Sequence, residues 1–281
     1  MKLSHKIAFV YLKTRLQLTA LVSPQKAAQK AFTLFCTPRR NHQQPLLSAI
    51  IKNAELISFR MNNLAIRGYR WNHPSPKKIL IAHGFESAAR NFEGFIHPLI
   101  NKGYEVIAFD APAHGRSDGT EITLPVYVQT LQRVVSEYGP FSAYMAHSFG
   151  GLAITHLLEV VPHTEQTRVV LIAPATEATT AINGFFHLLH LNGKVKAVFD
   201  RLAREKSGIP PEHLSIRRAV QNIKANFLWL DDDQDDITPY HDVEKVKNDH
   251  HSNIEFIISS GLGHRKIYRD KHTLNHILHF L

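Results

Sequence analysis

Cysteine is almost absent from this chain of 281 residues, which contains Cys36 and no other. A single cysteine excludes an intramolecular disulfide, and low cysteine usage is typical of proteins in a reducing compartment. Cys36 belongs to an apolar helical run and has no companion base in the sequence. We therefore expect a cytoplasmic protein in which Cys36 is a buried structural thiol.

Motifs for metals and nucleotides are also missing. The sequence contains no His-Glu-x-x-His, no closely spaced cysteine pair and no glycine-rich phosphate loop. His187 and His190 stand three residues apart, a spacing that we interpret as incidental. We therefore expect no cofactor, whether metal ion, nucleotide or prosthetic group.

The chain lacks a hydrophobic run long enough to cross a membrane. In the N-terminal segment, Lys13 and Arg15 interrupt the apolar run well before the roughly 20 residues that a spanning helix needs. Residues 7–12 are too short for the core of a secretory signal, and no small-residue cleavage site follows. The sequence therefore predicts neither a spanning helix nor a secretory signal.

Acidic side chains are absent from residues 1–54, which hold nine Lys or Arg. Residues 55–281 balance 24 basic against 24 acidic side chains, so the whole net charge of +9 belongs to the N-terminal segment. The basic residues match no recognised nucleic-acid-binding motif, and the rest of the chain is neutral. We therefore expect no nucleic-acid partner.

Two helices are predicted within this basic segment. The first covers residues 3–22. The second begins with Ser23 as N-cap and Pro24 in its first position, and ends near Phe35, before Pro38. Two interpretations stay open: the apolar faces lie on an anionic membrane surface, or they pack on the rest of the protein and leave the basic residues in water.

Beyond residue 54, short apolar runs alternate with amphipathic stretches. The first two runs, residues 55–60 and 64–71, predict a hairpin with its turn at Asn62 and Asn63. The alternation that follows predicts an α/β fold with a mostly parallel sheet covered by helices on both faces. Further strands are predicted over residues 78–82, 105–109, 141–146, 168–173, 226–230 and 254–258.

The domain organisation follows from length and from this pattern. A chain of 281 residues that is 44% hydrophobic is long enough for one large core. We expect residues 55–281 to form one domain beside the basic helical segment 1–54. Between residues 175 and 222 the alternation stops, and only helices are predicted.

A serine lies where an apolar strand turns into a helical stretch, in Tyr144-Met-Ala-His-Ser-Phe-Gly-Gly151. Such a sharp turn presents the hydroxyl of Ser148 to a base on one side and to a substrate carbonyl on the other. Strand and helix nearly collide at the bend, so the positions two before and two after the serine must be small. Ala146 and Gly150 meet this requirement, and Ser148 is the predicted nucleophile.

A second motif, His83-Gly84, follows the strand predicted over residues 78–82. The tetrahedral oxyanion of serine acyl transfer needs two backbone N–H donors. One comes from the residue after the nucleophile, here Phe149, and the other from the loop after this strand, here Phe85. These two N–H groups are the predicted oxyanion hole.

The third motif is an acidic loop, Asp231-Asp-Asp-Gln-Asp-Asp-Ile-Thr-Pro239, after a buried strand. A carboxylate beyond a strand end can hold the Nδ1–H group of a catalytic histidine. Five aspartates compete for this role. We predict Asp235, which precedes the loop-closing proline by four residues, with Asp233 and Asp236 as alternatives.

The fourth motif supplies the base. His264 ends the glycine-rich loop Ser259-Ser-Gly-Leu-Gly-His264 after the last predicted strand. His83, His114 and His147 are rivals, because each belongs to or adjoins a motif, although neighbours across a sharp elbow point apart. We predict His264, since the order Ser, Asp, His, each at the C-terminal end of a strand, is the one used by this strand–turn–helix architecture.

Residues from about 77 to 281 resemble the α/β-hydrolases. Within that superfamily they are similar to the esterase, monoacylglycerol-lipase and serine-aminopeptidase-like branch. Ala113 and Ala146 stand where these enzymes usually have glycine. The resemblance rests on His83-Gly84, Asp110-Ala-Pro-Ala-His-Gly-Arg-Ser117, Ala146-His-Ser-Phe-Gly150, Asp235-Asp-Ile-Thr-Pro239 and Gly263-His264.

The resemblance implies a small helical cap at about residues 175–222, inserted before the acid-bearing strand. It also makes Glu177 a further candidate for the acid, because some members of the superfamily place it there. Within the cap, Phe185, Phe186 and Leu188 are candidate residues for an acyl pocket. Packing of the cap on the core is an equal alternative for each of the three.

The activity implied is that of a serine hydrolase with a Ser148, His264 and Asp235 triad. The expected substrates are carboxylic esters with small to medium acyl chains, lipid esters included. The same scaffold supports thioesterases, amidases, peptidases and acyltransferases, and these alternatives stay open. From a different class, a non-catalytic lipid-binding protein is the remaining alternative. Besides the substrate, the one partner expected is an anionic membrane, which residues 1–54 would contact peripherally.

Overall fold

The computed structural model describes residues 3–39 and 47–281, with the side chains of the first helix given from residue 9 onward. Its contacts divide the chain into two compact units. The large unit comprises Pro38–Thr176 and Ser215–Leu281, and the small unit comprises Met1–Thr37 and Glu177–Leu214. Within the described part of the chain, none of the helices combines the length and apolar character needed to span a bilayer.

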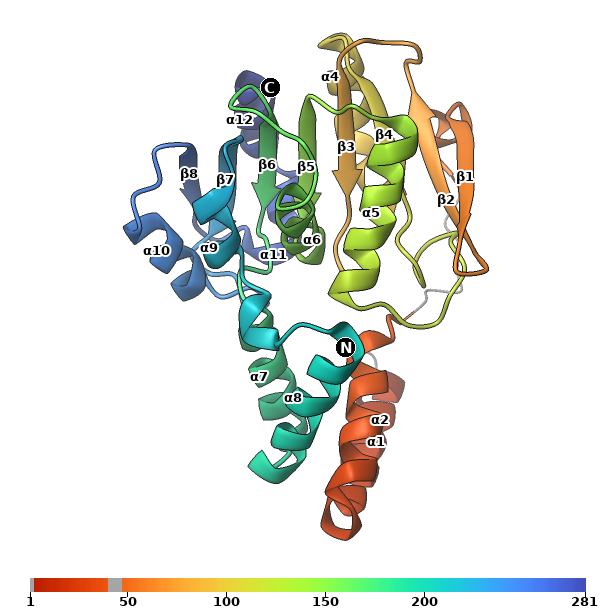
Figure 1. Ribbon diagram of the computed structural model, residues 1–281, viewed down its shortest axis with the longest axis vertical. Helices are drawn as coiled ribbons and strands as arrows, with labels where there is room; N and C mark the ends of the chain where they lie inside the picture. The colour runs from red at the N-terminus through yellow and green to blue at the C-terminus, as the bar shows by residue number, and fades with distance from the viewer. Residues whose placement is uncertain (1–2, 40–46) are drawn as a thin grey trace. The chain divides into compact units, whose positions relative to one another are not determined.

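The large unit is built on one eight-stranded sheet with the strand order β1-β2-β4-β3-β5-β6-β7-β8 (Figure 1). β1 and β2 form an antiparallel hairpin, and β2 also pairs with β4 in antiparallel fashion. All other neighbours are parallel. The strands are β1 (Glu55–Met61), β2 (Leu64–Trp71), β3 (Lys78–Ala82), β4 (Glu105–Phe109), β5 (Ala143–His147), β6 (Arg168–Ile172), β7 (Asn226–Asp232) and β8 (Ile254–Ser259). The predicted fold class, a mostly parallel α/β sheet, is confirmed.

Helices cover both faces of this sheet because alternate residues of its strands point to opposite sides. Ile79 and Ile81 of β3 share one core with Phe95 of α4 and Ile277 of α12. On the other face, α5 and α6 pack on each other, and α6 lies close to Leu171 of β6. The helices of this unit are α3 (Ala49–Lys52), α4 (Glu93–Asn101), α5 (Leu124–Tyr138), α6 (Phe149–Leu158), α9 (Ile216–Ala219), α10 (Tyr240–Asn248), α11 (Gly263–Lys266) and α12 (Lys271–Phe280), with 3-10 turns η1 (Ala89–Phe92), η3 (Val220–Asn222) and η4 (Ile267–Arg269).

Local signals account for several element boundaries. Asn62 and Asn63 both adopt positive φ angles of 47° and 63° at the β1–β2 turn, which matches the backbone twist that two-residue hairpins need. Ser23 caps the second helix by accepting a hydrogen bond from the N–H of Lys26, and Pro24 is its first residue. The predicted hairpin and the predicted helix start are confirmed.

The small unit is a helical cluster made from two distant parts of the chain. It contains α1 (Leu3–Val22), α2 (Pro24–Cys36), α7 (Ala178–Leu189) and α8 (Gly193–Ser207), followed by the 3-10 turn η2 (Pro211–His213). Phe32 of α2 packs against Phe199 of α8 with ring centroids 5.6 Å apart. Cys36 is buried in the same core, as predicted.

This grouping differs from the division expected on sequence grounds. The sequence suggested a boundary near residue 54 and assigned residues 175–222 to the hydrolase domain. In the structure, the two N-terminal helices share a core with the two inserted helices, whereas residues 47–54 lie in the large unit. One apolar side of α1 and one of α2 therefore pack in a core shared with α7 and α8.

Candidate active site

Ser148 lies at the turn between β5 and α6, where the backbone takes a conformation that non-glycine residues rarely adopt. Its φ angle is 53° and its ψ angle is −123°. The N–H of Ser148 donates to the carbonyl of Ile172 at 3.1 Å, and its carbonyl accepts from the N–H of Ala175 at 3.0 Å. A strained backbone that the surrounding structure holds in place is typical of an elbow that exposes a nucleophile.

Two glycines make room for this elbow. A Cβ atom on Gly150 would lie 2.4 Å from the carbonyl oxygen of Ala82, and one on Gly84 would lie 2.9 Å from Cβ of Ser148. Both distances are far below van der Waals contact, so no side chain fits at either position. The close approach of helix and strand that the sequence predicted at Gly150 is confirmed.

Replacing Gly150 by Ala is expected to destabilise the protein by about 2–3 kcal/mol, because the methyl group meets backbone atoms of β3 that cannot move aside. Gly94, near the start of α4, is the matched control, since a Cβ atom there meets nothing within 4 Å. Gly94→Ala should change the free energy of unfolding by less than about 0.5 kcal/mol. Urea unfolding of both variants checks this, and equal stabilities would contradict the packing described.

His264 and Asp235 meet Ser148 at the same edge of the sheet. The hydroxyl Oγ of Ser148 lies 3.0 Å from Nε2 of His264, and Nδ1 of His264 lies 2.8 Å from Oδ2 of Asp235. Ser148 follows β5, Asp235 follows β7 and His264 is the second residue of α11, which follows β8. All three side chains are buried or nearly so. The structure therefore places the three predicted residues in one hydrogen-bonded chain.

The carboxylate of Asp235 has several further partners. Oδ1 accepts from the N–H groups of Ile237 and Thr238, and the Thr238 hydroxyl donates to Oδ2 at 2.8 Å. Burial raises the pKa of this carboxyl. Three effects outweigh burial: the hydrogen bond from His264, the electrostatic attraction of the His264 ring, and the two backbone N–H groups. The pKa of Asp235 therefore lies below its ordinary value. Asp235 is therefore a carboxylate that faces the imidazole.

The other four aspartates of this loop have different surroundings. Asp231 is buried and accepts from the indole N–H of Trp229, and burial raises its pKa to about 7. Asp232 holds the β8–α11 loop by accepting from the hydroxyl of Ser259 and from the N–H groups of Gly261 and Leu262. The two alternatives to Asp235, Asp233 and Asp236, are exposed. Glu177, the further candidate for the acid, is the N-cap of α7 in the small unit.

Both predicted oxyanion donors adjoin the nucleophile, since Phe149 follows Ser148 in the chain and Phe85 follows Gly84, which approaches Cβ of Ser148 closely. Phe149 is the first residue of α6, whose initial N–H groups have no partner within the helix. Phe85 belongs to the loop after β3, and its ring meets that of Phe149 edge-on with centroids 6.1 Å apart. The N–H of Glu86, next to Phe85, donates to Nε2 of His114 at 3.1 Å. The loop is thereby held beside the nucleophile.

The three rival histidines serve as hydrogen-bonding parts of the framework around the site. His83 donates from Nδ1 to the carbonyl of Gly84 and accepts at Nε2 from the N–H of Ala111. His114 likewise donates from Nδ1 to the carbonyl of Pro112. Both rings are therefore neutral, and burial lowers the pKa of each to about 4.

His147 contacts the candidate base directly. Its Nε2–H donates to the carbonyl oxygen of His264 at 3.0 Å, and the two rings lie 4.6 Å apart. Burial lowers the pKa of His147 to about 3. This contact and those of Thr238 with Asp235 and His264 were missed by sequence reasoning. Their only signal was proximity to a motif, which does not reveal a hydrogen-bond partner.

These buried imidazoles predict loss of stability in acid. In the folded state His83, His114 and His147 stay neutral down to pH about 4, whereas in the unfolded chain they bind protons below about pH 6.5. Their contribution to stability is therefore present above that pH and lost as the pH falls towards 4. Each proton changes the unfolding free energy by about 1.4 kcal/mol per pH unit. The carboxyl of Asp231 opposes this trend, because its pKa of about 7 lets it hold about one more proton in the folded state than in the unfolded chain over the same pH range.

Urea unfolding at pH 7, 6 and 5 checks this expectation. The free energy of unfolding should fall from pH 7 to pH 5, and a His147→Asn variant should show a shallower slope. His279→Gln, an exposed histidine of α12, is the matched control and should keep the slope of the unaltered protein. Equal or greater stability at pH 5 would contradict the neutral, buried state of these rings.

The predicted acyl-pocket residues lie on α7 of the small unit. Phe186 is buried, and its ring packs edge-on against Phe199 with centroids 5.1 Å apart. The ring of Phe185 packs edge-on against that of Phe35 at 5.2 Å. Leu188 is 56% exposed. The two aromatic side chains therefore contribute to the core of the small unit, which agrees with the packing alternative.

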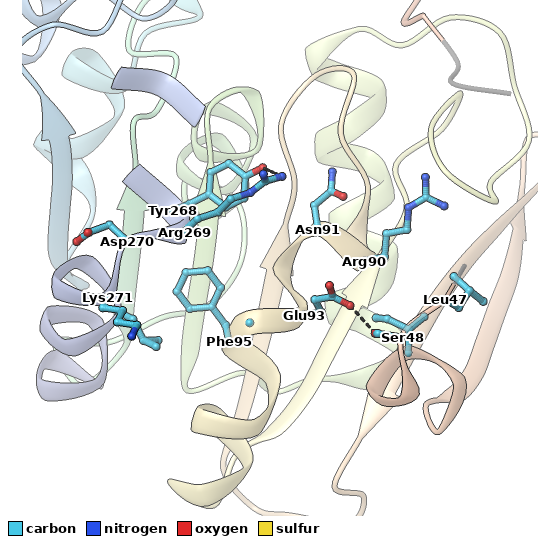
Figure 2. A pocket seen from close by; sticks show the side chains of 13 residues that line it. Leu47, Ser48, Arg90, Asn91, Glu93, Phe95, Tyr268, Arg269, Asp270 and Lys271 are labelled. Carbon is cyan, nitrogen blue, oxygen red and sulfur yellow. Dashed lines mark hydrogen bonds between the residues drawn. The ribbon is translucent and has the colours of Figure 1, made fainter. Parts of the chain in front are cut away.

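A separate surface pocket of about 490 Å³ lies between α3, α4 and the start of α12 (Figure 2). Its rim mixes charges, with Arg90 and Lys271 against Glu93 and Asp270, and Glu93 accepts a hydrogen bond from Ser48. It contains none of the candidate catalytic side chains. Within residues 3–39 and 47–281, no cluster of three or more His, Cys, Asp or Glu side chains is arranged to hold a metal ion.

Comparison with protein families shows which family of proteins has a matching sequence. The family described as serine aminopeptidase, S33, matches residues 73–221, which is more than half of the chain. The protein therefore belongs to this family and is a hydrolase of the α/β-hydrolase fold. The matched residues include Ser148 and end before Asp235 and His264.

Solved structures show the same fold. The Pyrococcus furiosus esterase Pf2001 is similar with a TM-score of 0.64 at 18% identity, over 88% of this chain and 96% of that one. Mouse alpha/beta hydrolase domain-containing protein 10 is similar with a TM-score of 0.60 at 17% identity, over 80% and 96%. The thioesterase domain from the curacin biosynthetic pathway has a TM-score of 0.59 at 15% identity, over 80% and 98%. Among curated protein sequences, none matches this chain.

Proposed function

We propose that the protein is a serine hydrolase that cleaves carboxylic esters through a covalent acyl-enzyme on Ser148. The observation that carries this proposal is the continuous chain of hydrogen bonds from Oγ of Ser148 through His264 to Asp235, with distances of 3.0 Å and 2.8 Å. Both distances lie within the range needed for proton transfer between a nucleophile and its base.

In the first half of the reaction, Nε2 of His264 accepts the proton of Ser148 while Oγ attacks the ester carbonyl carbon. The carboxylate of Asp235 keeps the other proton on Nδ1 and stabilises the imidazolium that forms. The backbone N–H groups of Phe85 and Phe149 bind the oxyanion of the tetrahedral intermediate. The intermediate collapses, and the alcohol leaves with the proton that His264 had taken.

In the second half, His264 accepts a proton from water, and the resulting hydroxide attacks the acyl carbon. The second tetrahedral intermediate uses the same two N–H donors. Its collapse breaks the bond to Oγ, His264 returns the proton to Ser148, and the carboxylic acid is released. The cycle thus balances with three reactants, namely the groups of the chain named above, the ester and one water molecule, and it returns Ser148 and His264 to their starting protonation states.

The choice of an ester over a thioester or an amide is tested with one acyl group and three leaving groups. Butyrate is offered as its p-nitrophenyl ester, as a thioester and as an anilide, and kcat/KM is compared. We expect the ester to exceed the anilide by at least about 100-fold. A thioester preference would make the protein a thioesterase, and an anilide preference would make it an amidase or peptidase; either result overturns the ester assignment.

A further inference from the structure

Helix α1 is apolar on both of its sides. Leu16 and Ala20 point into the core of the small unit, where they are buried. On the opposite side, Tyr11 is 66% exposed, Leu21 is 80% exposed and Val22 is 88% exposed. A concentration of exposed apolar side chains on a protein surface marks an interaction site, so the outer side of α1 calls for a partner.

This outer side is the main concentration of exposed apolar surface in the described residues. Of their nine large hydrophobic side chains that are exposed, five lie on α1 and a sixth, Leu188, lies on α7 of the same unit. The side chain of Gln17 on α1 donates to the carbonyl of Leu189, so the end of α7 lies beside α1. We call the set Val10, Tyr11, Leu18, Leu21, Val22 and Leu188 the apolar surface of the small unit.

Basic residues accompany this apolar surface. The small unit carries 11 Lys and Arg against four Asp and Glu, a net charge of +7, whereas the large unit carries 22 against 20, a net charge of +2. Arg15 of α1 and both Lys26 and Lys30 of α2 are exposed. The positive charge of the protein is thus concentrated in the unit that also exposes the apolar side chains.

We propose that the apolar surface of the small unit binds the surface of an anionic lipid bilayer. α1 lies parallel to that surface, with Tyr11, Leu18 and Leu21 at the boundary between headgroups and acyl chains. Arg15, Lys26 and Lys30 contact lipid phosphates. Burial of apolar area and attraction to anionic lipid both contribute to such interfacial binding, and α1 is not apolar enough to cross the bilayer.

Charge decides between a membrane and a second copy of the chain as the occupant of this surface. Pairing two copies through α1 would bring together two units that each carry a net charge of +7, and like charges repel. An anionic bilayer instead gains from every basic side chain near its surface. An anionic bilayer therefore both covers the apolar side chains of the small unit and attracts its basic side chains.

The test is flotation of the full chain with vesicles of phosphatidylcholine alone or with about three tenths phosphatidylglycerol. We expect flotation with the anionic vesicles, weakened by high salt. The variant Leu18→Ser, Leu21→Ser, Val22→Ser should lose at least about tenfold in partitioning, and Lys26→Gln with Lys30→Gln should lose binding to anionic vesicles specifically. Leu56→Ser with Val160→Ser, exposed apolar residues of the large unit, is the matched control and should float like the unaltered protein.

Circular dichroism establishes that each variant keeps its helices. Absence of flotation, equal flotation with neutral vesicles, or a dimer in light scattering that the triple variant dissociates would each overturn the proposal. The last result would assign the surface to self-association. This inference goes beyond the proposed hydrolysis, because a Ser148→Ala protein should float unchanged. Loss of activity and loss of membrane binding are therefore separable.

Discussion

Replacing Ser148 by Ala lowers kcat/KM for p-nitrophenyl butyrate by about 10⁴-fold or more while the protein stays folded. Without Oγ there is no nucleophile for His264 to activate at 3.0 Å, and triad members act as a unit, so the loss is far larger than that of one hydrogen bond. Steady-state hydrolysis, with thermal unfolding as a check on folding, measures the effect.

Ser142→Ala is the matched control for this substitution. Ser142 immediately precedes β5 and so lies at the opposite end of the strand that leads to Ser148; its hydroxyl donates to the carbonyl of Lys78. That variant should keep its activity within about twofold, because it touches no reacting group. A Ser148→Ala protein with more than about a tenth of the original activity would contradict the assigned nucleophile.

Replacing Asp235 by Asn lowers kcat by about 10³- to 10⁴-fold. The amide has nearly the shape of the carboxylate but no charge to stabilise the imidazolium, and it can hold His264 in the wrong tautomer. Because Oδ1 accepts from the N–H groups of Ile237 and Thr238, the loop should keep its fold. The loss should therefore appear in kcat, with the thermal midpoint changed little.

The neighbouring aspartates provide the controls that identify the acid. Asp233→Asn and Asp236→Asn change exposed carboxylates of the same loop and should leave kcat within about twofold. A fall of kcat in Asp236→Asn that matches or exceeds that of Asp235→Asn would transfer the role to Asp236. Full activity of Asp235→Asn would remove the carboxylate from the mechanism altogether.

The fold was predictable because its signals are local. Strands such as β3 and β5 consist almost entirely of buried residues, so they appear in the sequence as short continuous apolar runs. Caps and turns such as Ser23 and Asn62 mark where elements begin and end. The small residues around Ser148 are dictated by the close approach of α6 to β3.

The assembly of the small unit was not predictable in the same way. An apolar stripe on α2 shows that something covers it, but not which segment does. The covering helix α8 starts at Gly193, more than 150 residues away in the chain. The exposed apolar side of α1 could not be distinguished from its buried side, because both present apolar side chains.

The hydrogen-bonding roles around the site also required three dimensions. Five aspartates lie at the end of β7 or in the loop after it. Only geometry separates Asp235, which faces His264, from Asp232, which holds the next loop. The contact of His147 with the carbonyl of His264 joins residues 117 apart. Sequence could place such residues near the sheet edge, but it could not assign their partners.

The central claim is that Ser148 in the folded protein is an activated nucleophile that forms a covalent acyl intermediate. Reaction with a fluorophosphonate, followed by intact and peptide mass spectrometry, tests it most directly. One adduct per chain is expected, located on the peptide that contains Ser148, and it should be absent from Ser148→Ala and from heat-unfolded protein. Folded protein that gains no adduct, or gains it on another residue, would contradict the claim.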